Sequence, residues 1–381
     1  MVAAVTGTAV LGAGCGSSST TPSTAASGTS SAGVTEAKAT VAKLSQPTTS
    51  FKAPGPAINT SSLHGKSVWY IPISLQAPAF AIGNDALKTA LGKVGITEHV
   101  CSAEANPSTT ASCVNQAVSQ GASAIVTDAV PVALAANAFA SAQAHHLPIL
   151  IVNQLPPPAS VPGAVKGLGD DKLAYSPLQA GNLVAAEADW VVADSNGNAK
   201  VLVMPYTDSP STLAYSAQEV ARLHKLCPSC QVVSQKIGLA NASMVPSQTS
   251  SALLSHPGIQ YVTPEFDALN QGVAQGIQQA GYANKVKLVS SAGDLPALQA
   301  IKSGQLSAEV GESFPYEGWA NADEVMRMML GKPIVTEKPP LRLFTAANVA
   351  PLALTPAAQA SGEWYGSDAY TKMFEKLWGA G

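Results

Sequence analysis

The sequence carries little charge and few aromatic side chains. Only 12% of its 381 residues are charged and 6% are aromatic, the formal net charge is −3, and lysine and arginine never cluster beyond two residues. Nucleic acid needs a basic field and aromatic stacking platforms, so it is excluded as a partner. The chain also lacks G-x-S-x-G, H-E-x-x-H and glycine-rich phosphate-loop motifs. We therefore predict no catalytic residue, no cofactor and no metal site.

Apolar residues, in contrast, are plentiful at 46% of the chain. A chain of 381 residues exceeds the usual size of one hydrophobic core, and this much apolar material can fill two. We predict two globular lobes.

The N-terminus is typical of an export and anchoring signal. Residues 2–14 are small and apolar, and they are too few to cross the roughly 30 Å of bilayer hydrocarbon. They lead into Cys15 through Leu11-Gly12-Ala13-Gly14, which resembles a bacterial lipobox with Gly12 where the pattern has leucine. The resemblance implies a signal peptide over 1–15, lipidation of Cys15 and a lipid anchor in the cell membrane. The alternative is an ordinary apolar N-terminus with a buried cysteine.

A stretch rich in Ser and Thr follows Cys15. Such a composition cannot bury enough apolar surface to fold by itself. We predict a low-complexity tether over 16–63.

The other four cysteines form two local pairs. Cys101 and Cys113 would close a ring of about 13 residues, and Cys227 and Cys230 form a C-x-x-C. Disulfides are expected in an oxidising compartment outside the cytoplasm. A redox dithiol has its thiolate at the start of a helix, whereas this C-x-x-C follows one, and a zinc site would need two further ligands at motif spacing. Two structural disulfides are favoured over a redox pair or a metal site.

Strand and helix patterns alternate from residue 64 onward. Strands are predicted at 68–73, 97–101, 124–127 and 148–152, with helices at 79–94, 106–120 and 132–146. Such alternation requires right-handed crossovers and gives a parallel sheet covered on both faces. The first lobe is predicted over 64–168.

The same alternation restarts after residue 168. A helix through Trp190 lies in a predicted hinge or crossover at 169–198, and the second lobe is predicted over 199–335. Its strands are predicted at 200–204, 231–235, 259–262, 285–290 and 306–310. Residues 336–381 are predicted to wrap over the hinge or a lobe edge. The predicted fold class is α/β, with two Rossmann-like lobes of parallel sheet joined by a hinge and separated by a cleft.

Polar residues follow most of the predicted strands. Ligands of open parallel sheets bind at the carboxyl ends of the strands, so these residues are candidates to line the cleft. They are Gln76, Asp128, Asn153, Asp208, Ser209, Asp267, Asp294 and Glu312, with Phe80 as a flanking ring. Each could instead lie in a solvated loop or cap a helix. Together they suit a small polar or polyhydroxylated solute.

Several short motifs occur in an order that resembles the type I periplasmic binding proteins of the ribose- and galactose-binding kind. Ala117–Val126 is similar to the family's A-x-x-x-G-V-D-A-I-V, and Leu147-Pro148-Ile149 is similar to its I-P-V step. Phe266–Gly272 keeps the Asp and Gly of N-D-x-x-A-x-G, and Glu312–Gly318 resembles Q-x-P-x-x-x-G with Glu for Gln. The resemblance spans about residues 64–335. It implies an extracytoplasmic monomer that closes on a solute and delivers it to the permease of an ABC importer.

Two departures from the family pattern bear on the ligand. Sugar binders of this family usually have Asp after the fourth strand and Arg on the first helix of the second lobe, where this chain has Asn153 and Tyr215. Without an arginine in the cleft, a free carboxylate ligand is disfavoured. The acidic candidates suit a neutral or cationic solute better.

Other function classes are weaker but remain alternatives. A ligand-binding receptor for a membrane sensor would have the same sequence features as a transport protein. A secreted enzyme is disfavoured by the missing motifs. The effector domain of a lactose-repressor-like regulator would need a helix-turn-helix before residue 64, where the sequence is rich in Ser and Thr.

Overall fold

The computed structural model describes residues 1, 3–4, 25–156, 172–335 and 337–380, with only the backbone described for 25–31. The chain forms two sheets. The first has the order β2-β1-β3-β4-β5 and is parallel throughout. Its strands are β1 (Ser67–Pro72), β2 (Thr97–Val100), β3 (Ala124–Asp128), β4 (Ile149–Val152) and β5 (Leu173–Ser176).

The second sheet has the order β11-β10-β9-β8-β6-β7. Only the edge strand β11 runs antiparallel, against β10. The strands are β6 (Lys200–Met204), β7 (Gln231–Ser234), β8 (Tyr261–Pro264), β9 (Lys287–Ala292), β10 (Ala308–Glu312) and β11 (Leu341–Thr345). Each sheet is the centre of one lobe, so the predicted α/β class with two Rossmann-like lobes is confirmed.

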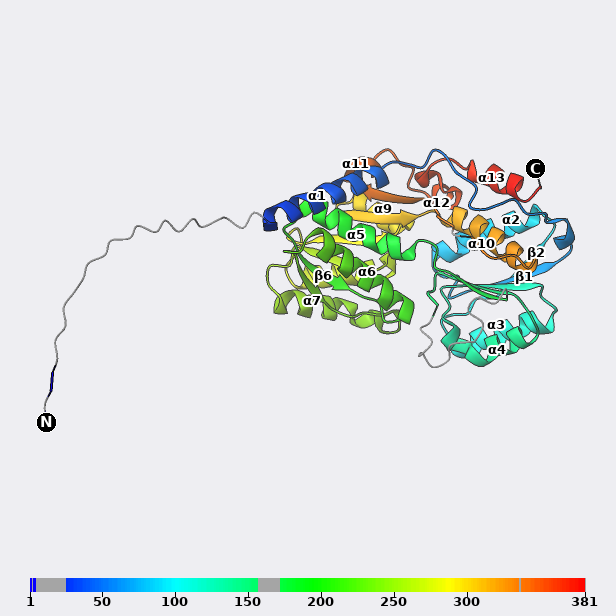
Figure 1. Cartoon of the computed structure of the whole chain (residues 1–381), viewed down its shortest axis with the longest axis horizontal. Helices are drawn as coiled ribbons and strands as arrows, with labels where there is room; N and C mark the ends of the chain where they lie inside the picture. Colours follow the sequence, from blue (N-terminus) through cyan, green and yellow to red (C-terminus); the bar gives the residue numbers. More distant parts are fainter. Residues whose placement is uncertain (2, 5–24, 157–171, 336, 381) are drawn as a thin grey trace.

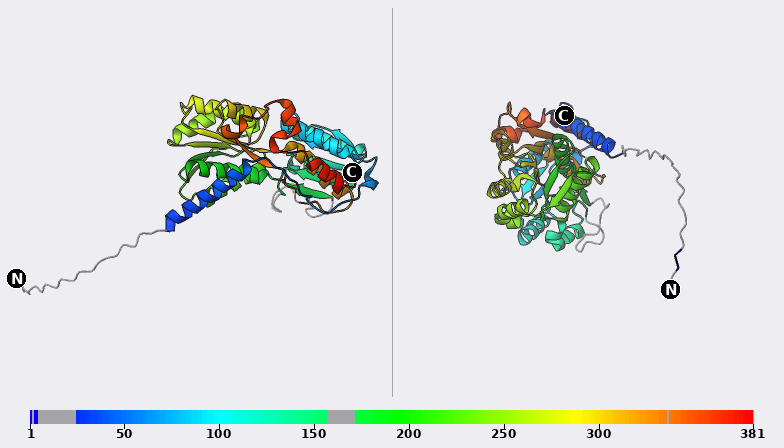
Figure 2. Two further views of the ribbon diagram at one scale, coloured as in Figure 1. Left: turned by 90° about the horizontal axis from the view of Figure 1, so that it is seen from above. Right: turned by 90° about the vertical axis from the view of Figure 1, so that its left-hand side faces the viewer.

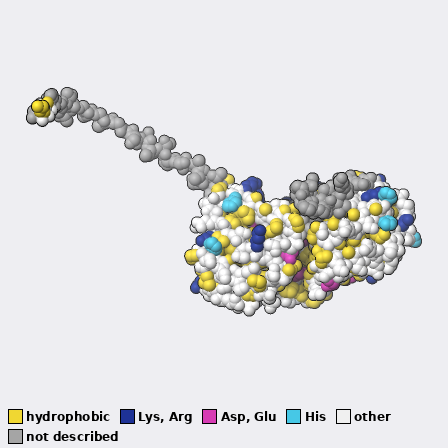
Figure 3. Space-filling view, turned by 90° about the horizontal axis from the view of Figure 1, so that it is seen from below, with side chains coloured by type: hydrophobic (Ala, Val, Ile, Leu, Met, Phe, Trp, Pro, Cys, Tyr) yellow, Lys and Arg dark blue, Asp and Glu magenta, His cyan; other side chains and the backbone are white. Residues whose placement is uncertain are grey.

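Helices cover both faces of each sheet (Figure 1). In the N-terminal lobe, α2 (Pro78–Gly92) and α10 (Phe314–Met329) cover one face, and α3 (Pro107–Ser119), η2 (Val132–Ala135) and α4 (Ala136–Ala144) cover the other. In the C-terminal lobe, α1 (Ala25–Leu44), α5 (Ala180–Ser195) and α6 (Pro210–Leu226) cover one face, and α7 (Val245–Ser255), α8 (Asn270–Gln279) and α9 (Leu295–Lys302) cover the other. The surface is hollowed where the two lobes meet (Figure 3).

The strands are apolar on both sides because both faces are covered. In β1, Val68 and Tyr70 belong to the core under α2 and α10, and Trp69 and Ile71 belong to the core on the opposite face. A strand buried on both faces has a continuous apolar run rather than an alternating one. That run is what made β1 recognisable in the sequence.

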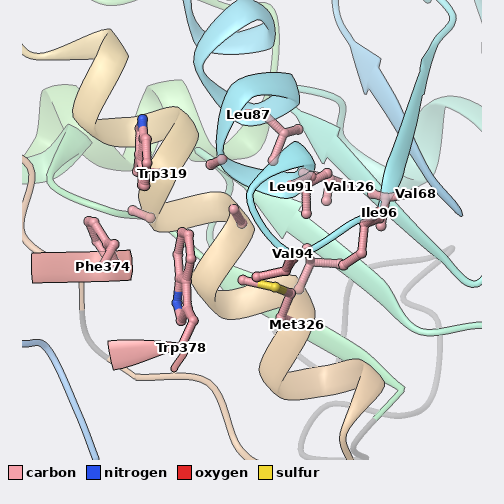
Figure 4. Packing of buried hydrophobic residues seen from close by; sticks show 14 of the residues in the cluster. Val68, Leu87, Leu91, Val94, Ile96, Val126, Trp319, Met326, Phe374 and Trp378 are labelled. Atoms are coloured by element: carbon pink, nitrogen blue, oxygen red, sulfur yellow. The ribbon is translucent and has the colours of Figure 1, made fainter. Parts of the chain in front are cut away.

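The helix α10 lies across α2 at a glycine. A Cβ on Gly318 would lie 2.5 Å from the carbonyl oxygen of Gly83, so only glycine permits this approach. The next residue, Trp319, stacks on Trp378 with ring centroids 5.4 Å apart and planes 9° apart, and Phe374 packs beside them (Figure 4). The C-terminal helix α13 (Tyr370–Leu377) is thereby fixed to α10.

The predicted domain boundaries are wrong at three places. The strand β5 was not predicted and lies inside the proposed hinge, where it completes the first sheet. The helix α5 follows in the same segment but belongs to the C-terminal lobe. The helix α10 was assigned to the second lobe, yet its apolar face fills the core of the first. The helical period identifies a helix, but it does not say which sheet the helix covers.

The predicted tether is also wrong within the described residues. The helix α1 packs along α5 and α6, with Ala37 fully buried and Glu36 paired with Arg222 at 2.6 Å (Figure 2). The chain then crosses to the other lobe, where Ile58 and Leu63 are buried. Composition misled here because the Ser/Thr-rich run ends near residue 31 and an apolar helix face follows it.

The last segment, 337–380, joins both lobes. After β11 it forms α11 (Ala346–Val349), α12 (Pro356–Ser361) and η5 (Glu363–Tyr365) on the C-terminal lobe, and α13 on the N-terminal lobe. It runs beside the crossing segment that follows α1: the amide of Thr48 donates to Tyr365 O at 2.8 Å, and that of Ile58 donates to Leu377 O at 2.9 Å. The segment that follows α1 and the segment 337–380 therefore both span the two lobes.

Both predicted disulfides are present. Cys101 at the end of β2 is bonded to Cys113 in α3, and Cys227 is bonded to Cys230 just after α6. The four sulfurs are thus structural cross-links within the lobes.

Removing the first disulfide is expected to cost more stability than removing the second. Because the entropy of loop closure grows with loop length, Cys101→Ala with Cys113→Ala should lower the free energy of unfolding by about 3 kcal/mol, against about 2 kcal/mol for Cys227→Ala with Cys230→Ala. Urea titration of the two double variants measures both values. An equal or larger loss for the second pair would contradict the prediction.

Candidate ligand site between the lobes

The carboxyl ends of three strands bring polar side chains to the junction of the lobes. Asp128 is the last residue of β3, Asn153 directly follows β4, and Glu312 is the last residue of β10. The helix α10 adds Glu317 one turn after its start, next to these strand ends. We call Asp128, Asn153, Glu312 and Glu317 the junction cluster.

The amide of Asn153 organises this cluster. Its Nδ2 donates to Asp128 Oδ1 at 3.0 Å and to Glu317 Oε1 at 2.8 Å. The backbone of Asn153 has φ +56°, a left-handed conformation that Asn tolerates better than most residues and that turns the chain out of β4. The hydroxyl of Tyr70 donates to the other oxygen of Asp128 at 2.8 Å.

The carboxyls of the cluster are buried, and among the described residues no lysine or arginine forms an ion pair with them. Asp128, Glu312 and Glu317 are 2%, 3% and 4% exposed. Burial, and then the charge of Asp128, raises the pKa of Glu312 to about 8. Burial raises the pKa of Glu317 well above its usual range, with further contributions from Asp128 and Glu312. Burial also raises the pKa of Asp128, against hydrogen bonds from Tyr70 and Asn153. At neutral pH the carboxyl of Glu312 is therefore mostly protonated.

The C-terminal lobe supplies the opposite side of the junction. Tyr215 of α6 is 2% exposed, and its hydroxyl has no hydrogen-bond partner among the residues that the structure describes. It packs with Ala180 and Val184 of α5, against Leu155 from the other lobe. The backbone amide of Leu155 donates to Ser211 Oγ at 2.9 Å, so the lobes are in direct contact. On the face seen in Figure 3, acidic side chains are visible in the hollow between the lobes.

Comparisons with known proteins identify the family. The periplasmic binding protein domain matches residues 70–333. The chain belongs to the periplasmic binding protein family. No curated protein matches it in sequence. The match to the family model confirms the resemblance inferred from the sequence motifs.

Solved structures share the fold of this periplasmic binding protein at low identity. A solute-binding protein of an ABC transporter from Agrobacterium vitis, bound to α-D-tagatopyranose, is 16% identical, with a TM-score of 0.65 over 76% of this chain and 97% of its own. The Caulobacter myo-inositol binding protein is 19% identical, with a TM-score of 0.62 over 77% and 96%. A Mycobacterium smegmatis protein in complex with β-D-fucofuranose is 14% identical, with a TM-score of 0.61 over 78% and 97%.

The family assignment settles the class of function. Periplasmic binding proteins bind solutes outside the cytoplasm and catalyse no reaction, so the prediction that the chain is not an enzyme is confirmed. None of the helices described combines the length and apolarity needed to cross a lipid bilayer. Across the described part of the chain, no group of three or more His, Cys, Asp or Glu is placed to hold a metal ion. Cys15, the predicted lipidation site, lies outside the described residues.

Four predicted site residues lie outside the cluster. The carboxylate of Asp208 is exposed and accepts the Leu239 amide at 3.1 Å. Ser209 is the N-cap of α6, with its hydroxyl accepting the Thr212 amide. Gln76 is exposed and donates to Glu104 at 3.3 Å, and Phe80 is half-buried near the start of α2. Asp208 and Ser209 therefore have local roles at the starts of η3 (Leu239–Met244) and α6.

Asp267 and Asp294 also lie apart from the cluster. They line a groove of about 760 Å³ between α8 and α9, and all the residues that line it belong to the C-terminal lobe. The carboxylate of Asp267 accepts the amide of Asp294 at 2.9 Å, and Asp294 accepts from Gln359 at 2.8 Å. Burial and the charge of Asp294 raise the pKa of Asp267 well above its usual range. Both carboxyls act on the pKa of Tyr365, as Glu312 does, and their predicted place in the cleft stays a prediction.

Two acidic residues at the junction were missed in the sequence. Glu317 lies one helical turn beyond a strand end, outside the window in which strand-end residues were sought. Glu265 directly follows β8 and is fully buried, with Oε2 accepting the Tyr206 amide at 2.9 Å. The strand-end rule would have found Glu265, had the predicted strand not ended at 262, two residues too early.

Proposed function

We propose that this periplasmic binding protein is a lipid-anchored receptor that captures a small polar solute between its lobes and delivers it to an ABC importer. The solute class is sugar-like, a polyol or another neutral or cationic solute. The neighbouring structures support this class, because those described above hold a monosaccharide or an inositol. The lipid anchor on Cys15 rests on the lipobox resemblance in the sequence.

The observation that carries the proposal is the polar junction between the lobes. Asp128, Asn153 and Glu317 come from one lobe, Tyr215 comes from the other, and Glu312 ends the strand that leads from one to the other. Side chains from both lobes can hydrogen-bond one solute only when the lobes are together. Binding therefore favours the closed state, and no chemical step is needed.

A thermal-shift screen of the full chain tests the proposal. The panel contains sugars, polyols, nucleosides, amines and amino acids. A solute at 100 times its dissociation constant should add about 2.7 kcal/mol to the stability. We expect Asn153→Ala to abolish the shift, because it removes the amide that orients two carboxyls, and Glu312→Gln to reduce it for a solute that binds the ionised carboxylate.

The matched control is Glu363→Gln, the same substitution at an exposed residue of the C-terminal lobe. It should leave the shift unchanged. A solute whose shift survives both Glu312→Gln and Asn153→Ala would place the binding site elsewhere.

A further inference from the structure

The junction cluster is an acidic site without a counter-charge. In the described part of the chain, the groups that act most strongly on the pKa of its three carboxyls are hydrogen-bonding polar groups and the other carboxyls, with no lysine or arginine among them. The side chains facing the cluster are Tyr70 from β1, Tyr215 from α6, Glu265 after β8 and Tyr365 from η5. None of these four can carry a positive charge. The cation of β11, Arg342, interacts with Tyr365 and donates to the carbonyl oxygen of Trp364, and it is not among the groups that act most strongly on the three carboxyls.

A second observation points to a missing partner. The hydroxyl of Tyr215 is buried and makes no hydrogen bond, and it lies within the influence of Glu265 and Glu312. One carboxyl oxygen of Glu312, Oε1, is also buried without a partner. Buried polar atoms are almost always hydrogen-bonded in folded proteins. Two unpartnered atoms of the C-terminal lobe that lie within each other's influence, beside Asp128 and Glu317 of the N-terminal lobe, indicate positions for ligand donors.

We propose that the solute carries a protonated amine beside its hydroxyl groups, and that Asp128, Glu312 and Glu317 bind the ammonium. This proposal rests on the proposed function and narrows the solute class. An ammonium offers three donors and one positive charge to carboxyls that have neither a cation nor a full set of donors. A hydroxyl group offers a single donor and no charge, so a neutral sugar would leave the carboxyls protonated.

Binding of an ammonium should release protons. Without ligand, the buried carboxyls stay protonated at pH values at which an exposed carboxyl would be ionised. Burial raises the pKa of Glu312 to about 8. An ammonium stabilises the ionised carboxylates, so a proton leaves to the solvent as the cation enters. The affinity for an amine should therefore rise with pH up to about 8, by as much as about tenfold per pH unit for each proton released. A neutral solute should show little dependence on pH or the opposite trend.

The test is isothermal titration calorimetry of the full chain with matched pairs of solutes that differ in one amine. The pairs are D-glucosamine with D-glucose, D-galactosamine with D-galactose, and 1-amino-1-deoxy-D-sorbitol with D-sorbitol. In at least one pair we expect the amine to bind about tenfold or more tightly than its neutral partner, with affinity rising between pH 6 and 7. Titration in two buffers of different ionisation enthalpy should show net proton release. Glu312→Gln should remove most of the preference for the amine, and Glu363→Gln should leave it intact.

The proposal is overturned if each neutral member binds as well as its amine, or if no amine binds at about 10 mM. A neutral solute that binds and is lost in Glu312→Gln would overturn the amine while leaving the proposed function standing. The proposed function fails separately, through the wider screen, if every solute found there binds independently of the junction.

Discussion

Replacing Arg327 with methionine is expected to lower the free energy of unfolding by about 3 to 5 kcal/mol. Arg327 is 1% exposed and donates to Asp323 at 2.7 Å and to the carbonyl of Pro56 at 3.0 Å. Its charge also lowers the pKa of two further buried carboxyls, Glu324 and Glu337, although burial raises both overall, to about 8 and about 10. At neutral pH these two glutamates are mostly protonated, so the variant would chiefly leave Asp323 buried without its cation.

The position of Arg327 adds to this effect. Asp323 also accepts the indole N–H of Trp378 at 2.7 Å, so one ion pair connects α10, the segment that follows α1, and the C-terminal end of the chain. Urea titration at neutral pH measures the loss. The control is Lys93→Met, which breaks an exposed ion pair with Glu375 in the same lobe and should cost at most about 1 kcal/mol. Equal losses for the two variants would show that the buried ion pair adds no more to the free energy of unfolding than the exposed one.

Most of the fold was predictable because its strands are buried on both faces. Runs such as Val68–Ile73 and Lys200–Met204 are continuous and apolar, and they are bounded by polar residues or turns, so both were located to within a residue or two. The missed strand β5 has the sequence Leu173-Ala174-Tyr175-Ser176, which is short and partly polar because it lies at the edge of its sheet. Length and burial thus decided which strands could be recognised.

Long-range contacts could not be predicted from local patterns. The helix α10 follows a strand of one sheet and covers the other, and nothing in its period encodes that choice. The helix α1 has its apolar residues Val34, Ala37, Val41 and Leu44 at helical spacing. They are small, and they follow a Ser/Thr-rich run that suggested a tether.

The strand-end rule selected three of the four residues of the junction cluster, whose role in binding a solute stays a prediction. Asp128, Asn153 and Glu312 are held at the junction by β3, β4 and β10, and the rule found all three. Asp267 follows the end of β8 by three residues and begins η4 (Asp267–Leu269), where it lines the groove between α8 and α9. Tyr215 was selected because it stands where the family has an arginine, and the structure places it at the junction as a buried hydroxyl.

The protein is expected to lose stability as the pH rises from about 5 to 8. The C-terminal lobe buries Glu219, Glu265 and Glu309, and burial raises their pKa values to about 8, 9 and 8. Below the unfolded pKa of 4.5 each group is protonated in both states, and its contribution to stability is complete. Above it the unfolded chain releases the proton while the folded chain keeps it, so stability falls by up to about 1.4 kcal/mol per pH unit and group until the folded pKa is reached.

The variant Glu219→Gln isolates one of these groups, because glutamine resembles the protonated acid and cannot ionise. Urea titration at pH 5 and pH 8 should show that the loss of stability between the two pH values is smaller than in the wild type by about 2 to 4 kcal/mol. Glu36→Gln is the control: its ion pair with Arg222 lowers the pKa of Glu36, so this group stays ionised in both states across the interval and the pH difference should not change. If Glu219→Gln keeps the full wild-type difference, the carboxyl of Glu219 is already ionised in the folded protein, and a cation or water must reach it inside the lobe.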